Sequence, residues 1–503
     1  MMFHKRWAGL TAIMAGTAIV FLDQTVLPVA LPTIQAKLGG SNVNIQWTVN
    51  IYFLVISALV LAAGKLSDRI GHRKIFSWGM WIFGISSALC ALSSNIGALI
   101  VSRGLQGIGA SFLFAAGAPL VMTLFGENER GKARGVQAGV SSIFLILGPF
   151  IGGYLTEFHS WRWIFWINLP ITFLGVILTQ LFVPLSPKYK NPIDKWGFIF
   201  FLISCSSVVT LLMYVNEWGF NSAPIISLLA VFVIATIFLL LREKKAEYPF
   251  LDLSLLKHPI FRGANISTCT IQFVMMIAIF RSIFFQDVLE WSPIKTGLIT
   301  VVTTLPALVV SPLAGILADR YGAKIPLVLG FLIMIYSFIW TPLIIQSSLV
   351  LILIGLFAYG IGIPLTLTPS YSSAMNAIPM TKAGSAFGIV TTLRNLSATL
   401  GVAVIGTILD TVHLLSFQRL VKKNELTRNL DPQLIEGLVY STDASREQLQ
   451  ALSPTKSQLL TQFLHKAEIE GFFYSHIIMA VFLITALGLI FILYNRESKS
   501  TNL

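Results

Sequence analysis

Residues 64–74 read Gly-Lys-Leu-Ser-Asp-Arg-Ile-Gly-His-Arg-Lys, and residues 315–324 read Gly-Ile-Leu-Ala-Asp-Arg-Tyr-Gly-Ala-Lys. The first glycine, the aspartate, the arginine and the second glycine of the two stretches are each 251 residues apart. Each stretch is a short polar break between two long apolar segments. One such loop can arise by chance, but a second in the corresponding place is best explained by a duplication. The sequence therefore predicts two related halves.

The composition is that of a protein whose surface lies mostly in lipid. Of its 503 residues, 55% are hydrophobic and 11% are charged, and the mean hydropathy is +0.78. A soluble domain usually carries about 25% charged residues, which it needs to cover its surface. These values exclude a soluble enzyme, a disordered chain and a nucleic-acid-binding protein.

The apolar segments predict the fold class. A membrane helix needs about 20 mostly apolar residues. The chain has fourteen such spans, at about 7–31, 45–64, 75–94, 96–125, 135–157, 162–184, 196–216, 224–241, 262–285, 297–318, 325–345, 348–372, 384–411 and 471–494. We therefore predict an all-α polytopic membrane protein with two six-helix bundles and two extra central helices. The predicted domains are the N-terminal bundle at 1–190, the extra helices at 191–245 and the C-terminal bundle at 246–503.

The positive charges predict the orientation of the chain. With the N-terminus in the cytoplasm, 22 of the 35 Lys and Arg residues fall on cytoplasmic segments, and the short outer loops hold only Lys37, Arg162 and Lys295. Cytoplasmic loops are enriched in Lys and Arg. Both termini are therefore predicted to be cytoplasmic, and most of the net charge of +13 reflects topology. The long outer loop at 412–470 is electrically balanced, and we expect short amphipathic helices lying at the outer surface there.

Five motifs in order resemble the major facilitator superfamily. Residues 64–74 match its cytoplasmic loop signature, and similar motifs of the first, fourth, fifth and sixth spans occur at 22–32, 103–110, 139–153 and 160–170. The chain looks most like the fourteen-span drug:proton antiporter branch, the EmrB/QacA-type exporters. The resemblance covers nearly the whole chain and implies the major facilitator fold and a transport function.

Two charges lie deep inside predicted spans. Asp23 is about eight residues from the outer end of the first span, and Arg103 is about seven residues from the outer end of the fourth, so both lie roughly 12 Å below the outer face. Intramembrane charges are costly and normally face a bundle interior or a cavity. We expect Asp23 and Arg103 to couple proton movement to substrate release; the alternative is a purely structural pair. Arg103 corresponds to Ile354 in the second half, which places this chemistry in the N-terminal half.

Two further sets are predicted to support conformational change. In the repeated loops, acids followed by cations favour a latch between helix ends, and the alternative is a tight turn with topology charges. Glycines and a proline in the fifth span favour a hinge, and the alternative is close helix packing. The latch comprises Gly64, Asp68, Arg69, Gly71, Arg73, Asp319 and Arg320, and the antiporter hinge comprises Gly139, Gly148, Pro149, Gly152 and Gly153.

A third set is predicted to line the substrate cavity. Aromatic rings suit cationic or amphipathic molecules, although packing or lipid contact is the commoner role of any one ring. The set comprises Gln24, Tyr52, Phe112, Phe114 and Arg394; the arginine suits either an anionic substrate or a backbone carbonyl. Arg281 and Asp410 lie near outer span ends, where snorkelling or gating is expected.

The motif survey finds no phosphate-binding loop and no zinc-ligand spacing, so we expect no enzyme activity, no metal and no cofactor beyond a proton gradient. The predicted function is a proton-coupled exporter of drugs or other amphipathic small molecules in the bacterial cytoplasmic (inner) membrane. The alternative is a dedicated metabolite, siderophore or lipid exporter, while a nutrient importer and a non-transporting receptor or scaffold fit less well. The expected partners are the lipid bilayer, protons and the substrate, with no nucleic acid. The resemblance also implies two further partners, a periplasmic adaptor and an outer-membrane channel.

Overall fold

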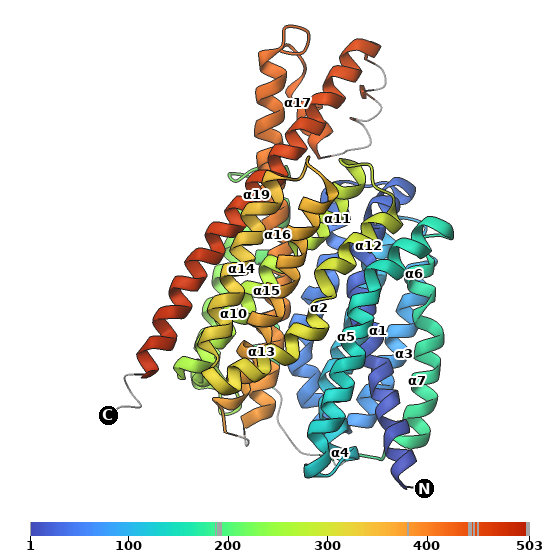
Figure 1. Cartoon of the computed structure of the whole chain (residues 1–503), viewed down its shortest axis with the longest axis vertical. Helices are drawn as coiled ribbons and strands as arrows, with labels where there is room; N and C mark the ends of the chain where they lie inside the picture. Colours follow the sequence, from blue (N-terminus) through green and yellow to red (C-terminus); the bar gives the residue numbers. More distant parts are fainter. Residues whose placement is uncertain are drawn as a thin grey trace.

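A computed structural model of the chain describes residues 2–186, 188, 194–379, 382–440, 445, 448–449 and 452–498. The predicted domain boundary at 190/191 and the predicted cytoplasmic cations Lys190 and Lys499 lie outside these residues. The described residues form helices and no strand. Figure 1 shows a bundle of roughly parallel helices, with both chain ends at one end and a helical hairpin projecting from the other. We call these ends the terminal face and the hairpin face.

Fourteen helical segments of the described residues are long and apolar enough to cross a membrane, and each overlaps one predicted span. The N-terminal half and the two extra helices comprise α1 (Met2–Leu38), α2 (Asn42–Ile70), α3 (His72–Ala91), α4 (Ile96–Leu124), α5 (Glu127–Phe158), α6 (Trp163–Trp166), α7 (Asn168–Phe182), α8 (Lys195–Trp218) and α9 (Ala223–Lys245). The 3₁₀ turn η1 (Leu253–Lys257) then leads into the second half.

The C-terminal half comprises α10 (Pro259–Met275), α11 (Ile277–Asp287), α12 (Pro293–Thr304), α13 (Ala307–Tyr321), α14 (Lys324–Leu343), α15 (Leu349–Asn376), α16 (Ala383–Lys423), α17 (Pro432–Val439) and α19 (Pro454–Ser498). Three spans are each built from two consecutive helices, with breaks at Ile167, at Met276 and at Leu305–Pro306. Pro306 lies in the last of these breaks. It has no backbone N–H, so it cannot donate a hydrogen bond to the preceding turn.

The repeated loops make the same turn in both halves. Gly71 lies between α2 and α3 with φ of 109°, and Gly322 lies between α13 and α14 with φ of 80°. Positive φ is open to glycine at little cost, which explains why the second glycine of both stretches is the same residue. The turn is therefore the structural reason for one shared position of the repeat.

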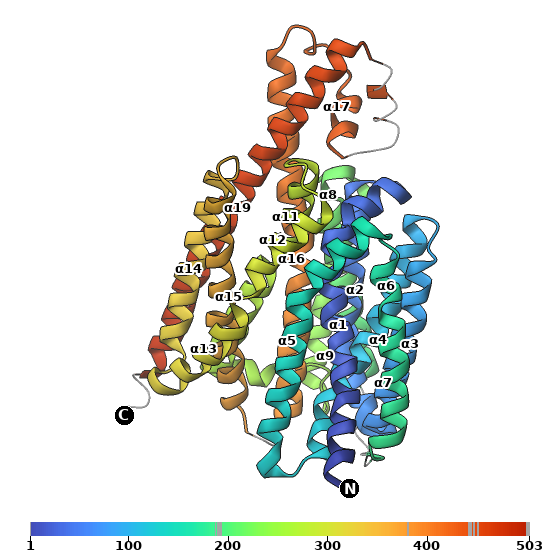
Figure 2. The ribbon, with the colours of Figure 1, turned by 45° about the vertical axis from the view of Figure 1, so that its right-hand side comes forward.

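The two halves close against each other at the hairpin face. Here α5 packs closely on α12, whereas α13 diverges from α5 toward the terminal face, as Figure 2 shows. A Cβ atom on Gly153 of α5 or on Gly297 of α12 would overlap the partner helix, at the backbone oxygens of Pro293 and Pro149 respectively. Further contacts between the halves join α2 to α16 and α1 to α11. The α5 and α12 backbones can therefore approach this closely only because glycine leaves no side chain between them.

The hairpin differs from the predicted surface-lying helices. The long helix α16 continues out of its span to Lys423, and α19 begins at Pro454, well before its own span. Apolar side chains on the facing sides of this hairpin form a separate core, which includes Phe417, Val421 and Leu460. The short helix α17 packs against it. Burial of these apolar faces explains why the loop extends outward instead of lying flat.

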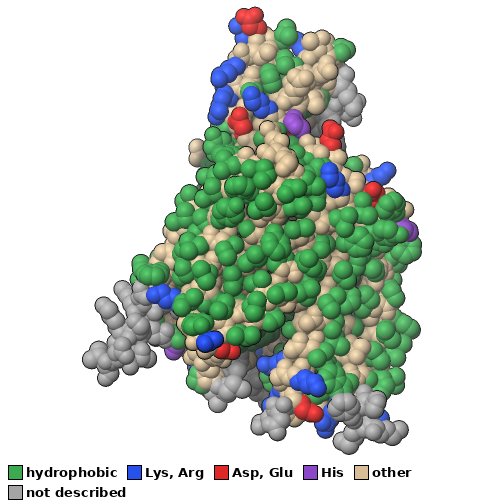
Figure 3. All heavy atoms as spheres, viewed as in Figure 1, with side chains coloured by type: hydrophobic (Ala, Val, Ile, Leu, Met, Phe, Trp, Pro, Cys, Tyr) green, Lys and Arg blue, Asp and Glu red, His purple; other side chains and the backbone are tan. Residues whose placement is uncertain are grey.

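The surface has the polarity of a membrane protein. In Figure 3 the middle of the visible face is covered by hydrophobic side chains, while Lys, Arg, Asp and Glu gather toward the two ends and on the hairpin. Large apolar side chains such as Leu181, Phe220 and Ile316 are more than half exposed. An apolar band of this kind is expected where the surrounding solvent is the bilayer interior.

Candidate functional site

Asp23 and Arg103 form a buried ion pair between α1 and α4. Arg103 Nη1 donates to Asp23 Oδ2 at 2.5 Å, and the two residues are 1% (Arg103) and 3% (Asp23) exposed. The Arg103 Nε also donates to the Thr48 carbonyl of α2 at 3.0 Å. Truncating one partner of such a buried pair costs about 3–5 kcal/mol, because it leaves an uncompensated charge. The pair joins three helices of the N-terminal bundle.

Gln106, one turn after Arg103 on α4, completes the network. Its Oε1 accepts from Arg103 Nη1 at 2.6 Å, and its Nε2 donates to Asp23 Oδ1 at 2.9 Å. The same Nε2 donates to Ser87 Oγ of α3 at 2.8 Å, and Asn168 of α7 donates to that hydroxyl at 3.2 Å. Both carboxylate oxygens of Asp23 therefore have a donor. Gln106 and Asn168 belong to the fourth- and sixth-span motifs at 103–110 and 160–170, but the sequence assigned neither of them a role, and it did not single out Ser87. The three-residue spacing of Gln106 from Arg103 places both on one helix face.

Tyr52 covers the guanidinium from α2. Its ring centre lies 4.2 Å from the Arg103 Cζ, and its side chain is fully buried. A cation held over an aromatic face is stabilised, and more strongly away from water. Tyr52, predicted to line the substrate cavity, thus lies within the ion-pair site. Its neighbour Gln24 is half-buried next to Asp23 on α1.

The remaining predicted cavity residues lie apart from one another. Phe114 is half-buried and meets Phe21 of α1 edge to face, with ring centres 5.9 Å apart. Phe112 packs against α3, where a Cβ on Gly79 would lie 2.9 Å from the Phe112 Cβ. Arg394 lies in the C-terminal bundle, and its Nε donates to Gln272 Oε1 at 3.1 Å. Phe112 and Phe114 thus belong to the N-terminal bundle and Arg394 to the C-terminal bundle, and a shared role in a substrate cavity stays a prediction.

The first repeated loop is tied to its surroundings at the terminal face. Arg73 donates to the carbonyl and the side chain of Gln180 on α7, at 2.7 and 2.8 Å. Asp68 lies 3.7 Å from His72 Nε2, and the loop residue Arg69 is exposed. The first loop glycine, Gly64, has open space where a Cβ would point. In the second loop, Asp319 and Arg320 are both exposed, and the Arg320 guanidinium lies 5.3 Å from the Tyr321 ring.

The predicted hinge residues mostly mark close contacts of α5. A Cβ on Gly148 would overlap Thr25 of α1, and one on Gly152 would lie 2.6 Å from the Val26 oxygen. Together with the Gly153 and Pro149 contacts to α12, these positions hold α5 against two helices. Gly139, by contrast, has nothing within 4 Å of such a Cβ. Pro149 lies inside a helix that is continuous from Glu127 to Phe158.

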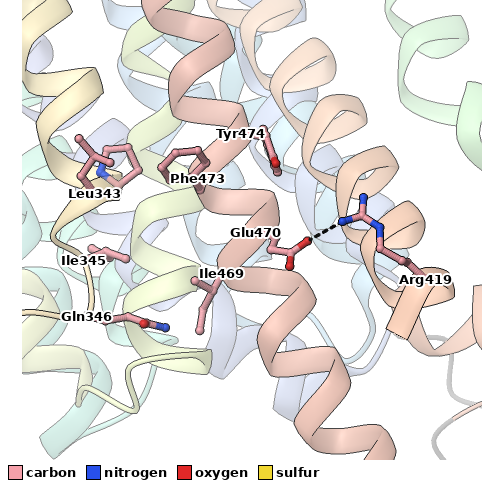
Figure 4. Close-up of a pocket in the computed structure, with 9 residues that line it drawn as sticks. Leu343, Ile345, Gln346, Arg419, Ile469, Glu470, Phe473 and Tyr474 are labelled. Carbon is pink, nitrogen blue, oxygen red and sulfur yellow. Dashed lines mark ion pairs between the residues drawn. The ribbon is translucent and has the colours of Figure 1, made fainter. Parts of the chain in front are cut away.

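Two cavities lie near the hairpin face. One lies beside α14 and α19, where Arg419 faces Glu470 at 3.8 Å next to Leu343, Phe473 and Tyr474 (Figure 4). The other lies between the halves and is lined by Gln35, Asn42 and Gln46 from the first half and by Phe280, Phe284, Asp287, Asp410, His413, Glu468 and Phe472, among others, from the second. Within the described part of the chain, no cluster of His, Cys, Asp and Glu has the arrangement of a metal site.

Arg281 differs from its expected position near the outer membrane surface. Its side chain is 3% exposed and lies inside the C-terminal bundle. The expectation placed the end of the ninth span at residue 285, but the direction of a side chain from its helix decides burial more than its distance from the helix end. The C-terminal half therefore contains a buried charge of its own.

Comparison with known proteins gives the following relations. The family model described as Major Facilitator Superfamily matches residues 13–402. The chain is 35% identical to the riboflavin transporter RibZ of Clostridioides difficile over 403 residues, which cover 79% of this chain and 87% of the relative. It is 30% identical to the multidrug resistance protein Stp of Mycobacterium tuberculosis (78% and 74% covered) and 30% identical to the puromycin resistance protein pur8 of Streptomyces alboniger (80% and 82% covered).

Among solved structures, the chain is similar to a bacterial homolog of the human lysosomal transporter Spinster in an inward-facing, unoccupied conformation. The TM-score is 0.65, the sequence identity is 16%, and 97% of each chain is covered. At this identity the similarity extends to the fold.

Proposed function

Since the chain belongs to the Major Facilitator Superfamily and is a membrane transporter, we propose that it is a proton-coupled antiporter that exports amphipathic small molecules by alternating access. The observation that carries the proposal is the buried network of Asp23, Arg103 and Gln106. Intramembrane charges are costly, and in transporters they commonly serve proton relays or substrate pathways, which favours a proton-coupled carrier over an uncoupled one.

The proposed coupling works through the charge of Asp23. With the carboxylate ionised, Arg103 is neutralised and helices α1, α2 and α4 are held together. A proton on Asp23 removes the counter-charge, so the guanidinium must find other acceptors or more water. Proton binding and release therefore favour different arrangements of these helices, as a ligand that binds two states unequally shifts their equilibrium.

The proposed orientation puts both termini in the cytoplasm, in line with the positive charges of the terminal face. We propose that the cytoplasmic side, where α13 diverges from α5, is the open side of this conformation, and that the α5–α12 contact closes the outer side. In this arrangement a substrate enters from the cytoplasm or the inner leaflet. Loss of the α5–α12 contact, together with engagement of the 64–74 latch, completes the export step.

The test uses everted membrane vesicles with an imposed proton gradient and fluorescent drug substrates. We expect drug addition to dissipate the gradient and the drug to accumulate inside. Asp23→Asn should abolish both effects while the protein remains folded and able to exchange substrate without a gradient. Asp252→Asn, outside the spans, is the control with an equal change of charge. Full gradient-driven export by Asp23→Asn would refute the coupling role.

The second candidate function is a dedicated carrier of one metabolite. The 35% identity to a riboflavin transporter favours it. Vesicles loaded with riboflavin and with drugs separate the two proposals. A narrow carrier exchanges riboflavin or one related metabolite and ignores the drugs, whereas a multidrug exporter exchanges several unrelated compounds.

We also propose that the hairpin at 412–470 is the surface that a periplasmic adaptor and, through it, an outer-membrane channel would contact. It projects from the proposed outer face and has its own apolar core. Deletion of its tip, followed by co-purification with a host adaptor, tests this. Equal recovery of the adaptor with and without the tip would contradict it.

A further inference from the structure

Arg281 and His476 form a second buried polar centre, in the C-terminal bundle. The Arg281 Nε of α11 donates to His476 Nε2 of α19 at 3.1 Å. The other ring nitrogen, Nδ1, lies 2.8 Å from the Phe472 carbonyl and donates to it. His476 is therefore a neutral imidazole with its proton on Nδ1, because Nε2 must accept. It supplies no negative charge to balance the arginine.

The outer end of the Arg281 guanidinium has no acceptor. Both Nη1 and Nη2 are buried without a hydrogen-bond partner, and no Asp or Glu pairs with Arg281 among the described residues. Its faces are covered by Tyr359 at 4.6 Å and Phe338 at 5.2 Å, measured from Cζ to the ring centres. The two rings and the Nε hydrogen bond to His476 hold the side chain in place. The N–H groups of Nη1 and Nη2, which form the planar fork of the guanidinium, remain without an acceptor.

The two other intramembrane arginines provide a comparison. Arg103 has a carboxylate, an amide oxygen and a carbonyl as acceptors, and Arg394 has the side-chain oxygen of Gln272. Neither has a guanidinium nitrogen that is buried without a partner. Arg281 thus differs from both in having a fork that the protein itself does not fill.

A helix break lies next to this fork. The span divides at Met276 into α10 and α11, and the Tyr359 hydroxyl reaches the Met275 carbonyl at 3.5 Å. Tyr359 therefore contacts both the break and the guanidinium. The N-terminal end of α11 carries a partial positive charge, and a side chain on a helix leans toward the N-terminus of that helix. Arg281 adds a full charge to the same end. In transporters, the N-termini of interrupted helices point at anionic groups of substrates.

We propose that the Arg281 fork, Tyr359 and the start of α11 form a binding site for the carboxylate of an aromatic acid. A carboxylate matches the two parallel N–H groups of a guanidinium, and this bidentate pair is strong away from water. Phe338 and Tyr359 lie over the guanidinium and make the surroundings of the fork aromatic, which favours an acid that carries an aryl group. The site is separate from Asp23 and Arg103 and does not depend on the proposed proton coupling or direction of transport.

The nearby acids disfavour the cavity between the halves as the place where the carboxylate binds. The cavity between the halves contains Asp287, Asp410 and Glu468, which repel an anion. Phe472 stacks on Phe284 and on His476, with both ring-centre distances 4.0 Å, and so separates that cavity from the fork. The aromatic acid therefore binds on the arginine side of this layer.

The test is thermal unfolding of the full-length protein in lipid nanodiscs with sodium benzoate as the probe. Sodium chloride at equal ionic strength controls for screening, and benzamide is the uncharged analogue. We expect benzoate to raise Tm of the wild-type protein by a few degrees, and neither control to do so. Arg281→Gln should lose the shift, whereas Arg394→Gln, the matched change at another intramembrane arginine, should keep it.

A second variant covers the case in which Arg281→Gln does not fold. Arg281→Lys keeps the charge but loses the fork, and it should need roughly tenfold more benzoate for the same shift. An unchanged shift in the folded Gln or Lys variant would overturn the proposal. An equal effect of benzamide, or an effect of chloride as large as that of benzoate, would also overturn it.

Discussion

Gln106 completes the Asp23–Arg103 site, because one amide group donates to the carboxylate and accepts from the guanidinium. The Gln106 amide accepts from Arg103 and donates to both Asp23 and Ser87, whereas a hydroxyl has a single donor and an ionised carboxylate has none. The cost of burying the two charges is offset because each of them has several hydrogen-bond partners.

Gln106→Met tests this at the residue scale. Removing the amide leaves Asp23 Oδ1 without its side-chain donor, so we expect a loss of about 1–3 kcal/mol in the free energy of unfolding. The proton dependence of transport should change with it. Thermal unfolding and the pH profile of drug exchange measure the two effects. Gln24→Met, at a half-buried position next to Asp23, is the control and should change stability less.

Asp252 tests the contact between η1 and the start of α16. Burial alone would raise the pKa of Asp252, but hydrogen bonds from Ser254 and the Lys382 ammonium at 3.0 Å outweigh it and lower that pKa below its ordinary value of 3.8. A lowered pKa in the folded state stabilises the protein above the unfolded-state pKa, and this contribution is lost as the pH falls through the folded-state value.

We therefore expect Asp252→Asn to lower Tm slightly at neutral pH, with the difference from wild type shrinking below about pH 3.8 and vanishing once the pH has fallen through the lower folded-state pKa. The effect is small because the pair is largely solvated. Thermal unfolding between pH 3 and pH 7 measures it. A difference that persists unchanged in acid would contradict this assignment.

At the element scale, α5 is the helix that joins the two halves at the hairpin face. Gly153→Val places a branched side chain against Pro293 of α12, and overpacking of this kind costs about 1–3 kcal/mol. We expect the closed hairpin face to lose population and drug export to fall. Distances between spin labels on α5 and α12 measure the opening.

Gly139→Val is the matched control, because the same helix has open space at that position. It should leave both the distances and export close to wild type. If the two variants behave alike, then α5–α12 packing does not set the population of the closed face.

The elements also show which features are readable from sequence. All fourteen spans were predictable, because the bilayer requires about 20 consecutive apolar residues. The breaks at Ile167 and Met276 were not, since neither position is a proline or glycine. Nor was the outward extension of α16 and α19, whose stabilising contacts are made across the hairpin between residues distant in sequence.

The site divides in the same way. Asp23 and Arg103 were identifiable because a charge in an apolar segment is costly and rare. Ser87 is neutral and of a type common in membrane helices, so nothing in the sequence distinguishes it from an ordinary packing residue. Asn168 stands in the sixth-span motif, but the motif does not reveal that its side chain reaches Ser87 of another helix. Arg281 was expected to snorkel or to act as a gate near an outer span end, and its burial was not predictable, because the hydropathy of a segment does not reveal which way a side chain points. The functional roles themselves stay predictions.

At the scale of the whole molecule, α17 joins the hairpin to the N-terminal half. Asn42 Nδ2 donates to the Val439 carbonyl at 3.3 Å, and the Asn42 backbone N–H donates to the Tyr440 carbonyl at 3.4 Å. The hairpin belongs to the C-terminal half through α16 and α19. This contact therefore spans both halves while the hairpin face is closed.

Cysteines at Asn42 and Tyr440, with Cys90, Cys205 and Cys269 replaced, should form a disulfide that arrests transport until a reductant is added. The backbone contact puts the two positions within the range that a disulfide needs. Vesicle drug exchange before and after reduction is the measurement. A pair at Ser416 and Glu470, both within the hairpin, is the control and should not arrest transport. Undiminished exchange by the cross-linked 42–440 pair would show that the contact need not open.

The α5–α12 closure has a thermal consequence. Its closest contacts are between backbones at Gly153, Pro293, Gly297 and Pro149, and the Ile294 N–H donates to Glu157 at 2.8 Å beside them. Opening this face exposes mainly apolar surface to water, which raises the heat capacity of the open state. The logarithm of the open-to-closed ratio should then curve with temperature and have a minimum. In an organism that grows well above or below that temperature, the transporter would more often be open at the hairpin face.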